Sequence, residues 1–286
     1  MIDEADMQKT MLITGATDGI GFETAKMLAK QGHYVLLHGR NEDKLKKLEQ
    51  ALLAHCETAT FESYCADLSN MSEVIALAQA VTEKHQHLDI LINNAGVYNV
   101  DNSLTVDGLD PRFAVNTVAP YLLTHALLPL MNKVSRVLNL SSAAQSTVNI
   151  NALRGLERLG DSEAYAQSKL ALTMWSRVMG LALKAKGPVI IAINPKSLLG
   201  SKMVKEAFGI SGSDLSIGAE VLCQAALCDD FAHASGLYFD NDHEKFSDPH
   251  PDALNEDKCR AVVTAIQATI NKDDFVSSMQ PLNHQL

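Results

Sequence analysis

The stretch that decides the fold is "MLITGATDGIGFETAKML", residues 11–28. It begins as an apolar run typical of a strand, turns at Gly15, Gly19 and Gly21, and continues with the spacing of an amphipathic helix. Such a turn lets the backbone approach a pyrophosphate, and the helix N-terminus attracts its charge. The stretch predicts a dinucleotide-binding unit. Its G-x-x-x-G-x-G spacing differs from the usual G-x-G-x-x-G, so a tight connection without a ligand is the alternative.

Outward from this stretch, apolar runs alternate with helical segments along the chain. This βαβ rhythm requires a parallel sheet with helices on both faces. The predicted strands are 11–16, 34–39, 61–66, 88–96, 136–142, 188–194 and 236–239, and the predicted helices are 19–31, 42–54, 71–85, 111–131, 162–185 and 254–271. We therefore expect a single-domain α/β fold of the Rossmann type, a doubly wound sheet of roughly seven parallel strands.

No linker or internal repeat divides the 286 residues, so one domain, 1–286, is expected. Two segments are longer than a sheet of this kind requires, 143–161 and the polar 240–258. Both are interpreted as loops or lids over a site.

Composition and charge exclude several classes of function. The 24 Lys and Arg residues against 34 Asp and Glu give a net charge of -10 without a basic run, so no nucleic-acid partner is expected. The start, "MIDEADMQKT", is acidic and polar, and no stretch is expected to supply the roughly 20 apolar residues of a membrane span. These features predict a cytoplasmic protein without membrane association. Five scattered cysteines without a C-x-x-C pair indicate neither a disulfide framework nor a metal site.

The end of the second predicted strand bears on the choice of dinucleotide. An acid there would bind the adenosine 2′-hydroxyl and repel a 2′-phosphate, but "YVLLHGRNEDK" (34–44) has no acid at the strand end and places Arg40 just after it. A guanidinium suits a phosphate, which favours NADP(H) over NAD(H). In the alternative interpretation, Arg40 is a solvated loop residue paired with Glu42 or Asp43.

Four motifs in order lead to a family. The glycine turn is followed by "NNAG" at 93–96, "SS" at 141–142 and "YAQSK" at 165–169. With these, the chain resembles the classical short-chain dehydrogenase/reductase family over about residues 10–240. The details "TGATDGIGFETA", an insertion after Ser142 and a late "SGLYF" are most similar to its bacterial and retinol-dehydrogenase-like branch. The resemblance implies a substrate loop at 196–212 and a C-terminal extension at 241–286.

The spacing of Tyr165 and Lys169 has a chemical reason. A phenol with its ordinary pKa near 10 is a weak base at neutral pH. An ammonium one helical turn along, together with the positive charge of an oxidised nicotinamide, would favour the phenolate. Tyr165 is thus expected to be the acid and base, with Lys169 lowering its pKa and, by the resemblance, binding the nicotinamide ribose.

The resemblance also assigns the other site residues. Ser142 would polarise the substrate carbonyl, with Ser141 as the competing assignment. Asn116 would bend its helix and help to hold a relay water, although an Asn before Pro120 can simply mark a kink. The implied cofactor-binding residues are Gly15, Thr17, Asp18, Gly19, Ile20, Gly21, Arg40, Asp67, Leu68, Asn93, Ala95, Gly96, Tyr165, Lys169 and Pro195.

One residue departs from the family pattern. After the sixth predicted strand the family usually has Pro-Gly, whereas "INPKSLLGSKM" places Lys196 in the glycine position. A side chain there is costly if the backbone is left-handed. Either the loop follows a different path, or Lys196 adds a cation on the nicotinamide side.

The leading hypothesis is an NADP(H)-dependent oxidoreductase that interconverts an alcohol and its ketone or aldehyde. A non-catalytic NADP(H)-binding module that senses redox state is the alternative, resting mainly on Lys196; an epimerase or dehydratase with tightly held NAD is a third hypothesis. By the resemblance, the helices at 111–131 and 162–185 would form the interface of a homodimer or homotetramer, unless the sheet takes up their apolar faces.

Overall fold

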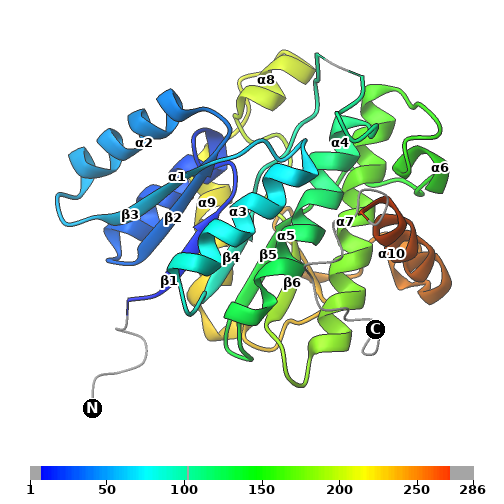
Figure 1. Cartoon of the computed structure of the whole chain (residues 1–286). Helices are drawn as coiled ribbons and strands as arrows, with labels where there is room; N and C mark the ends of the chain where they lie inside the picture. Colours follow the sequence, from blue (N-terminus) through cyan, green and yellow to red (C-terminus); the bar gives the residue numbers. More distant parts are fainter. Residues whose placement is uncertain (1–7, 102, 271–286) are drawn as a thin grey trace.

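A sheet of eight strands forms the centre of the computed structural model, which describes residues 8–101 and 103–270 (Figure 1). The strand order is β3-β2-β1-β4-β5-β6-β7-β8; all neighbours pair in parallel except β7 and β8, which are antiparallel. The strands are β1 (Thr10–Ile13), β2 (Tyr34–Gly39), β3 (Thr60–Cys65), β4 (Ile90–Asn93), β5 (Arg136–Leu140), β6 (Val189–Asn194), β7 (Tyr238–Asp240) and β8 (Lys245–Ser247). The predicted doubly wound α/β fold is confirmed, with one strand more than expected.

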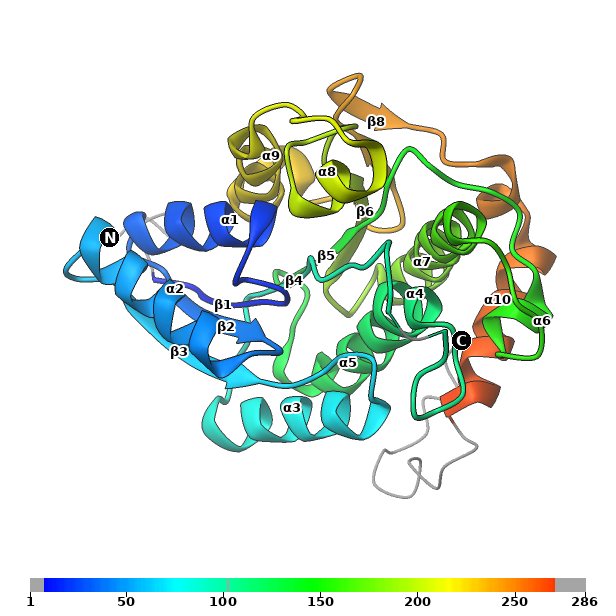
Figure 2. The ribbon, with the colours of Figure 1, turned by 90° about the horizontal axis from the view of Figure 1, so that it is seen from above.

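The central strands are largely buried because helices cover both faces of the sheet. Every residue of β5 and β6 is buried, which explains why their sequences do not alternate between apolar and polar residues. One core packs against α3 (Met71–Lys84), α5 (Ala119–Leu127) and α7 (Asp161–Leu183). A second packs against α1 (Gly19–Lys30), α2 (Glu42–His55) and α9 (Leu215–Leu227) on the opposite face, as the view from above indicates (Figure 2).

The strand order reverses between β1 and β4, where the chain returns to the centre of the sheet. Crevices at such switch points, beyond the carboxyl ends of the strands, are where open α/β sheets bind ligands. The remaining elements are α4 (Pro111–Phe113), the π-helical η2 (Ala114–Val118), η3 (Leu128–Leu130), α6 (Ile150–Leu153), α8 (Lys202–Phe208), η4 (Asp229–Phe231), η5 (Pro251–Leu254) and α10 (Glu256–Ile270).

Several elements were not predicted, and the two that bear on the sheet are α9 and β8. Helix α9 covers the sheet beside α1, and β8 extends the sheet where a loop or lid was expected. Phe246 of β8 packs against Phe231 and Phe239, with ring centroids 5.2 Å away in each case. These aromatic contacts explain why part of a polar segment forms a strand at the edge of the sheet.

The end of the described chain packs against the helices that were expected to form an interface. Helix α10 lies alongside α7, and Gln267 donates a hydrogen bond to the Tyr121 hydroxyl at 3.0 Å (Figure 1). The part of the predicted C-terminal extension that is described thus covers a helix face. Residues 271–286 of that extension lie outside the described residues.

One segment corrects the expectation about membrane spans. The helical run Pro111–Leu130 has a mean hydropathy of 1.3 and is long and apolar enough to cross a membrane. However, 78% of its apolar window is buried inside the fold. Its apolar side chains are therefore those of a core helix.

Candidate active site

A cavity of about 590 Å³ opens at the carboxyl ends of the parallel strands. It brings together most of the site residues predicted from the sequence, although they come from seven separate segments of the chain. The predicted residues on its wall are Gly15, Thr17, Asp18, Gly19, Ile20, Arg40, Asp67, Leu68, Ala95, Gly96, Ser142, Tyr165, Lys169 and Pro195. Gly21, Asn93 and Asn116 lie behind the wall.

At one end of the cavity a glycine leaves the backbone accessible to a phosphate. Gly15 has a φ of 64°, and a Cβ on it would lie 2.9 Å from the Cα of Ala95. Asp18 is the N-cap of α1, whose first turn faces the cavity at Gly19 and Ile20. A left-handed glycine turn followed by a helix N-terminus fits the pyrophosphate of a dinucleotide.

His38 was not singled out from the sequence, but it connects this turn to the neighbouring strand ends. The Gly15 N–H donates to His38 Nδ1 at 3.2 Å, and His38 Nε2 lies 3.0 Å from the Ala66 carbonyl oxygen. Burial lowers the pKa of His38 to about 4. The ring is therefore neutral near pH 7, with its proton on Nε2, and fixes the glycine turn by hydrogen bonds alone.

Arg40 lies exposed at the far end of the cavity, just after β2. Among the described residues it forms no salt bridge, so the alternative pairing with Glu42 or Asp43 is not seen. Lys44, in the first turn of α2, lines the same end and was not predicted. Two cations at this end contrast with the net charge of -10 of the chain.

The "NNAG" motif contributes its second asparagine to the wall. Asn93 is buried and donates to Thr124 Oγ1 at 3.1 Å and to Asn139 Oδ1 at 2.8 Å, inside the fold. Asn94 lines the cavity and donates to the carbonyl oxygens of Thr14 and Gly15 at 2.9 and 3.0 Å. Asn94, and not the predicted Asn93, thus faces the cavity, because successive residues of an extended chain point to opposite sides.

Tyr165 and Lys169 share one face of α7, as expected, and the Lys169 Nζ lies 5.7 Å from the centre of the Tyr165 ring. Lys169 is 4% exposed and donates to the Leu140 carbonyl oxygen at 2.7 Å. Burial lowers its pKa to about 8. The pKa of Tyr165 is raised, chiefly by burial, although a hydrogen bond with Ser142 opposes the shift. The expected depression of the Tyr165 pKa is therefore not present in the protein alone.

The two serines after β5 have different surroundings. Ser141 is 4% exposed, and its hydroxyl lies 2.6 Å from Thr173 Oγ1 on α7. Ser142 is half-buried on the cavity wall and is hydrogen-bonded to Tyr165. Its Oγ also accepts a hydrogen bond from the Ala144 N–H at 3.1 Å. Ser142 thus has the hydroxyl placed to reach a ligand beside Tyr165.

Asn116 connects three segments from behind the cavity. Its Oδ1 accepts from the Val97 N–H at 2.8 Å, and its Nδ2 donates to the Val97 carbonyl at 3.0 Å and to Ser168 Oγ at 3.0 Å. It sits in the π-helical turn η2, a local widening of the helix often found at functional sites. The irregularity expected in this helix is thus a π-helical segment, which lies before Pro120 in the chain.

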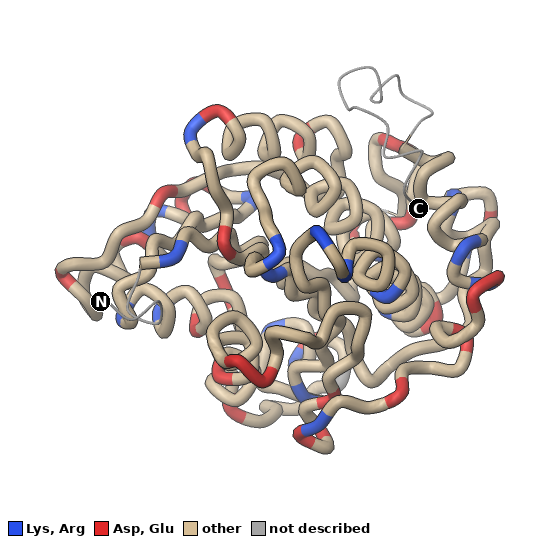
Figure 3. Tube along the Cα trace, turned by 90° about the horizontal axis from the view of Figure 1, so that it is seen from below, with Lys and Arg blue, Asp and Glu red and all other residues tan. Residues whose placement is uncertain are grey.

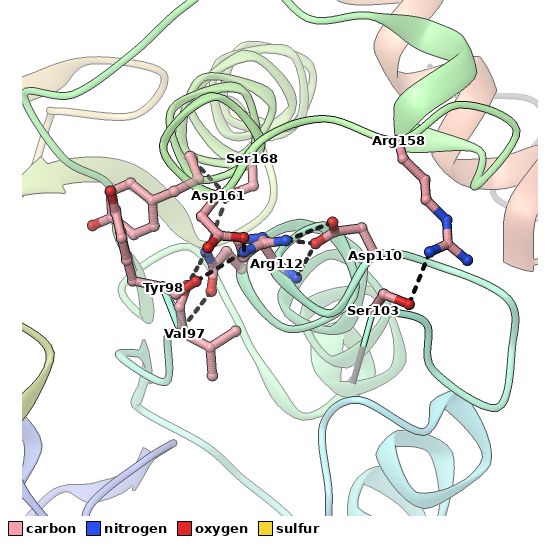
Figure 4. Close-up of polar contacts among 10 residues, drawn as sticks. Val97, Tyr98, Ser103, Asp110, Arg112, Arg158, Asp161 and Ser168 are labelled. Atoms are coloured by element: carbon pink, nitrogen blue, oxygen red, sulfur yellow. Dashed lines mark hydrogen bonds and ion pairs between the residues drawn. The ribbon is translucent and has the colours of Figure 1, made fainter. Parts of the chain in front are cut away.

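A buried arginine fixes the loop after β4 beside the tyrosine (Figure 4). Arg112 is 3% exposed, forms a two-pronged ion pair with Asp110, and donates to Asp161 at 2.6 Å and to the Tyr98 carbonyl at 3.1 Å. The Tyr98 ring packs 5.0 Å from the Tyr165 ring, and its hydroxyl lies 2.5 Å from Ser162 Oγ. Tyr98 was not predicted, and its place just after "NNAG" is the only signal in the sequence that could have pointed to it.

The loop after β6 forms another part of the wall. Residues 194–199, 201–204 and 206 line the cavity, and they include the first part of the predicted substrate loop, 196–212. Lys196 has a φ of 121°, so it keeps a conformation that glycine would adopt without strain. By contrast, Ala144 is the only residue of the described segment 143–161 that lines the cavity, and no residue of 240–258 lines it. The interpretation of these two segments as loops or lids over the site is therefore not supported within the described chain.

The switch-point cavity, the glycine turn and the Tyr-Lys pair define a Rossmann-type, dinucleotide-dependent oxidoreductase. The model of the short chain dehydrogenase family matches residues 9–209, and the chain belongs to that family, to its retinol-dehydrogenase-like branch. It is an NAD(P)-dependent oxidoreductase acting on CH–OH groups.

Individual relatives agree with this membership. Mouse retinol dehydrogenase 13 is 28% identical over 90% of this chain and 82% of its own length, and mouse retinol dehydrogenase 12 is 32% identical over 81% and 77%. A metagenomic short-chain oxidoreductase solved in complex with NADP is 26% identical, with a TM-score of 0.62 over 80% of this chain and 96% of its own.

Proposed function

We propose that this protein is an NADP(H)-dependent oxidoreductase that interconverts an alcohol and its ketone or aldehyde. The observation that carries the proposal is one cavity whose wall combines a phosphate-type glycine turn at one end with Ser142, Tyr165 and Lys169 at the other. A dinucleotide bound along this cavity would supply or accept a hydride at its nicotinamide ring.

The side chains around that reaction would divide the work. Ser142 donates a hydrogen bond to the substrate oxygen, and Tyr165 gives a proton to that oxygen on reduction or takes one on oxidation. The raised pKa keeps Tyr165 protonated near pH 7, the form that reduction requires. Lys169 would hold the nicotinamide ribose, and Asn116 would keep the loop at Val97 and helix α7 in place.

The preference for NADP(H) rests on Arg40 and Lys44. Both line the adenosine end of the cavity, Arg40 without an ion pair among the described residues, and a guanidinium matches a 2′-phosphate well. The NADP bound by the metagenomic relative is consistent with this preference.

The substrate side of the cavity favours an apolar alcohol. The cavity wall also includes Tyr98, Val115, Ala144, Met203 and Val204, which offer aromatic and aliphatic contact to a ligand. Binding pockets of this composition recognise mostly apolar ligands through a few polar groups, here Ser142 and Tyr165. The names of the two mouse relatives are consistent with an apolar alcohol.

We further propose a cytoplasmic protein that acts without nucleic acid or membrane. Along the coloured part of the trace in Figure 3, Lys and Arg are interspersed with Asp and Glu instead of forming a continuous basic stretch. Helix α10 covers part of α7, so an oligomer could use only the faces of α7 that α10 leaves uncovered. We therefore propose the predicted homodimer or homotetramer only through the remaining surfaces of the helices at 111–131 and 162–185.

The alternative of a non-catalytic sensor rested on Lys196. Lys196 has the left-handed backbone that a glycine would adopt there, and its loop lines an open cavity. The lysine in the glycine position is therefore no longer an argument that the cofactor site is blocked. Catalysis is therefore the function that the geometry supports best.

The test is Tyr165→Phe. We expect its affinity for NADPH, measured by nicotinamide fluorescence, to stay within about twofold of the wild type, and its turnover of a panel of aldehydes and ketones to fall by roughly 10²- to 10⁴-fold. Tyr34→Phe is the matched control, because that hydroxyl bonds Glu62 at a distance from the cavity. Near-normal turnover in Tyr165→Phe would overturn the assignment, and NADPH binding without turnover in the wild type would favour the sensor.

A further inference from the structure

Two residues with side chains hold left-handed backbone in the loop after β6. Lys196 has a φ of 121° and Leu198 a φ of 54°, and both line the cavity. Residues with a Cβ rarely adopt such angles, and they do so only where the surroundings fix the chain. The loop therefore needs contacts that oppose its relaxation.

These contacts come from one turn. The segment Asp240–Asn241–Asp242 ends β7 and begins the connection to β8. On one side of Lys196, the Asn194 amide donates to Asp240 Oδ1 at 2.8 Å and to Asp242 Oδ2 at 2.9 Å. The Asn241 amide donates to the Pro195 carbonyl at 3.0 Å, and the Asn241 N–H donates to the Asn194 carbonyl at 3.1 Å.

On the other side of Lys196, Asp242 binds Ser197. Its Oδ1 accepts from the Ser197 N–H at 3.0 Å and its Oδ2 accepts from the Ser197 hydroxyl at 2.5 Å. The turn thus holds the residues immediately before and after the strained one. Because these bonds involve a carboxylate, they are among the stronger hydrogen bonds available to an exposed loop.

We propose that the turn Asp240–Asn241–Asp242 is a clasp that holds the Lys196 loop in its ligand-binding shape, with Asp242 as the main positioning residue. The inference rests on the proposed function, since the loop lines the cavity in which the nicotinamide would lie. It also explains why Lys196 is tolerated in a glycine position: the contacts on either side of it offset the strain of its backbone.

The clasp predicts that Asp242 and Lys196 are coupled. Asp242→Ala removes the acceptor of both Ser197 bonds, so the strained loop relaxes and affinity for NADPH should fall roughly tenfold. In a Lys196→Gly background the left-handed backbone is no longer strained, so Asp242→Ala should weaken binding by less than about threefold. Asp248→Ala is the control: it removes an exposed carboxylate beyond β8 and should leave binding unchanged.

The experiment measures the four proteins, wild type, both single variants and the double variant, by NADPH titration and by hydrogen exchange of residues 194–201 without nucleotide. Faster exchange in Asp242→Ala that Lys196→Gly restores, with the matching pattern in affinity, is the expected result. Equal effects of Asp242→Ala in both backgrounds, or no effect on exchange, would overturn the clasp. If the wild type binds no nucleotide, the proposed function fails, and the exchange data still decide the clasp.

Discussion

Lys169→Met should reveal by how much the buried charge of Lys169 lowers the free energy of unfolding. Lys169 is buried, and its pKa falls from an ordinary value of 10.5 to about 8 because its charge has lost solvent. Each pH unit between the folded and unfolded pKa is worth roughly 1.4 kcal/mol, so the buried charge lowers the free energy of unfolding by about 3 kcal/mol at pH 7.

The sign of the pH dependence follows from proton binding. Between about pH 8 and 10.5 the unfolded chain keeps this proton and the folded chain has released it, so the stability of the wild type rises with pH in this window. Methionine carries no charge and lacks this rise. Relative to the wild type, the unfolding free energy of Lys169→Met should therefore fall by about 2 kcal/mol between pH 7 and pH 9.5.

Urea unfolding of both proteins at the two pH values measures this change, and taking their difference cancels the groups that titrate in both. The bond from Lys169 to the Leu140 carbonyl is lost in the variant, which shifts the stability difference by a similar amount at both pH values. Lys186→Met, at an exposed lysine beyond α7, is the control and should show no such change. A stability difference that is the same at both pH values would refute the reasoning.

The other predictions concern the cofactor end of the cavity. Arg40→Ala should weaken NADPH binding roughly tenfold and leave NADH binding within about twofold, as measured by fluorescence titration, because the guanidinium would contact only the 2′-phosphate; an equal loss for both nucleotides would contradict the NADP(H) preference. Gly21→Ala would place a Cβ 2.3 Å from the Gly15 carbonyl oxygen and 2.4 Å from the Asn94 amide, so thermal unfolding should reveal a loss of about 1–3 kcal/mol. Gly160→Ala, where a Cβ meets nothing within 4 Å, should lose less, at most about 1 kcal/mol because alanine is a poorer N-cap than glycine. Equal losses in the two variants would argue against the predicted clash.

The sequence was most informative where the structure is built from local segments. The strand, the turn at Gly15 and most of the following helix lie within 18 consecutive residues, 11–28, so their signals can be interpreted together. His38 and Asn94 were missed because their roles depend on which strands are neighbours in space. Strand β8 was missed for the same reason, since Phe246 gains its aromatic contacts only where the fold brings it beside Phe231 and Phe239.

The features that the sequence did not reveal are concentrated at the catalytic end of the cavity. Lys169 is a buried cation, Lys196 keeps a left-handed backbone, and the ion pair of Arg112 with Asp110 lies almost out of solvent. Each would lower stability by itself, and each is held by partners from distant parts of the chain: Leu140 for Lys169, and the turn at 240–242 for the loop of Lys196. Local rules favour the most stable choice at every position, so they fail where a site requires a charge or a backbone angle that only its surroundings can maintain.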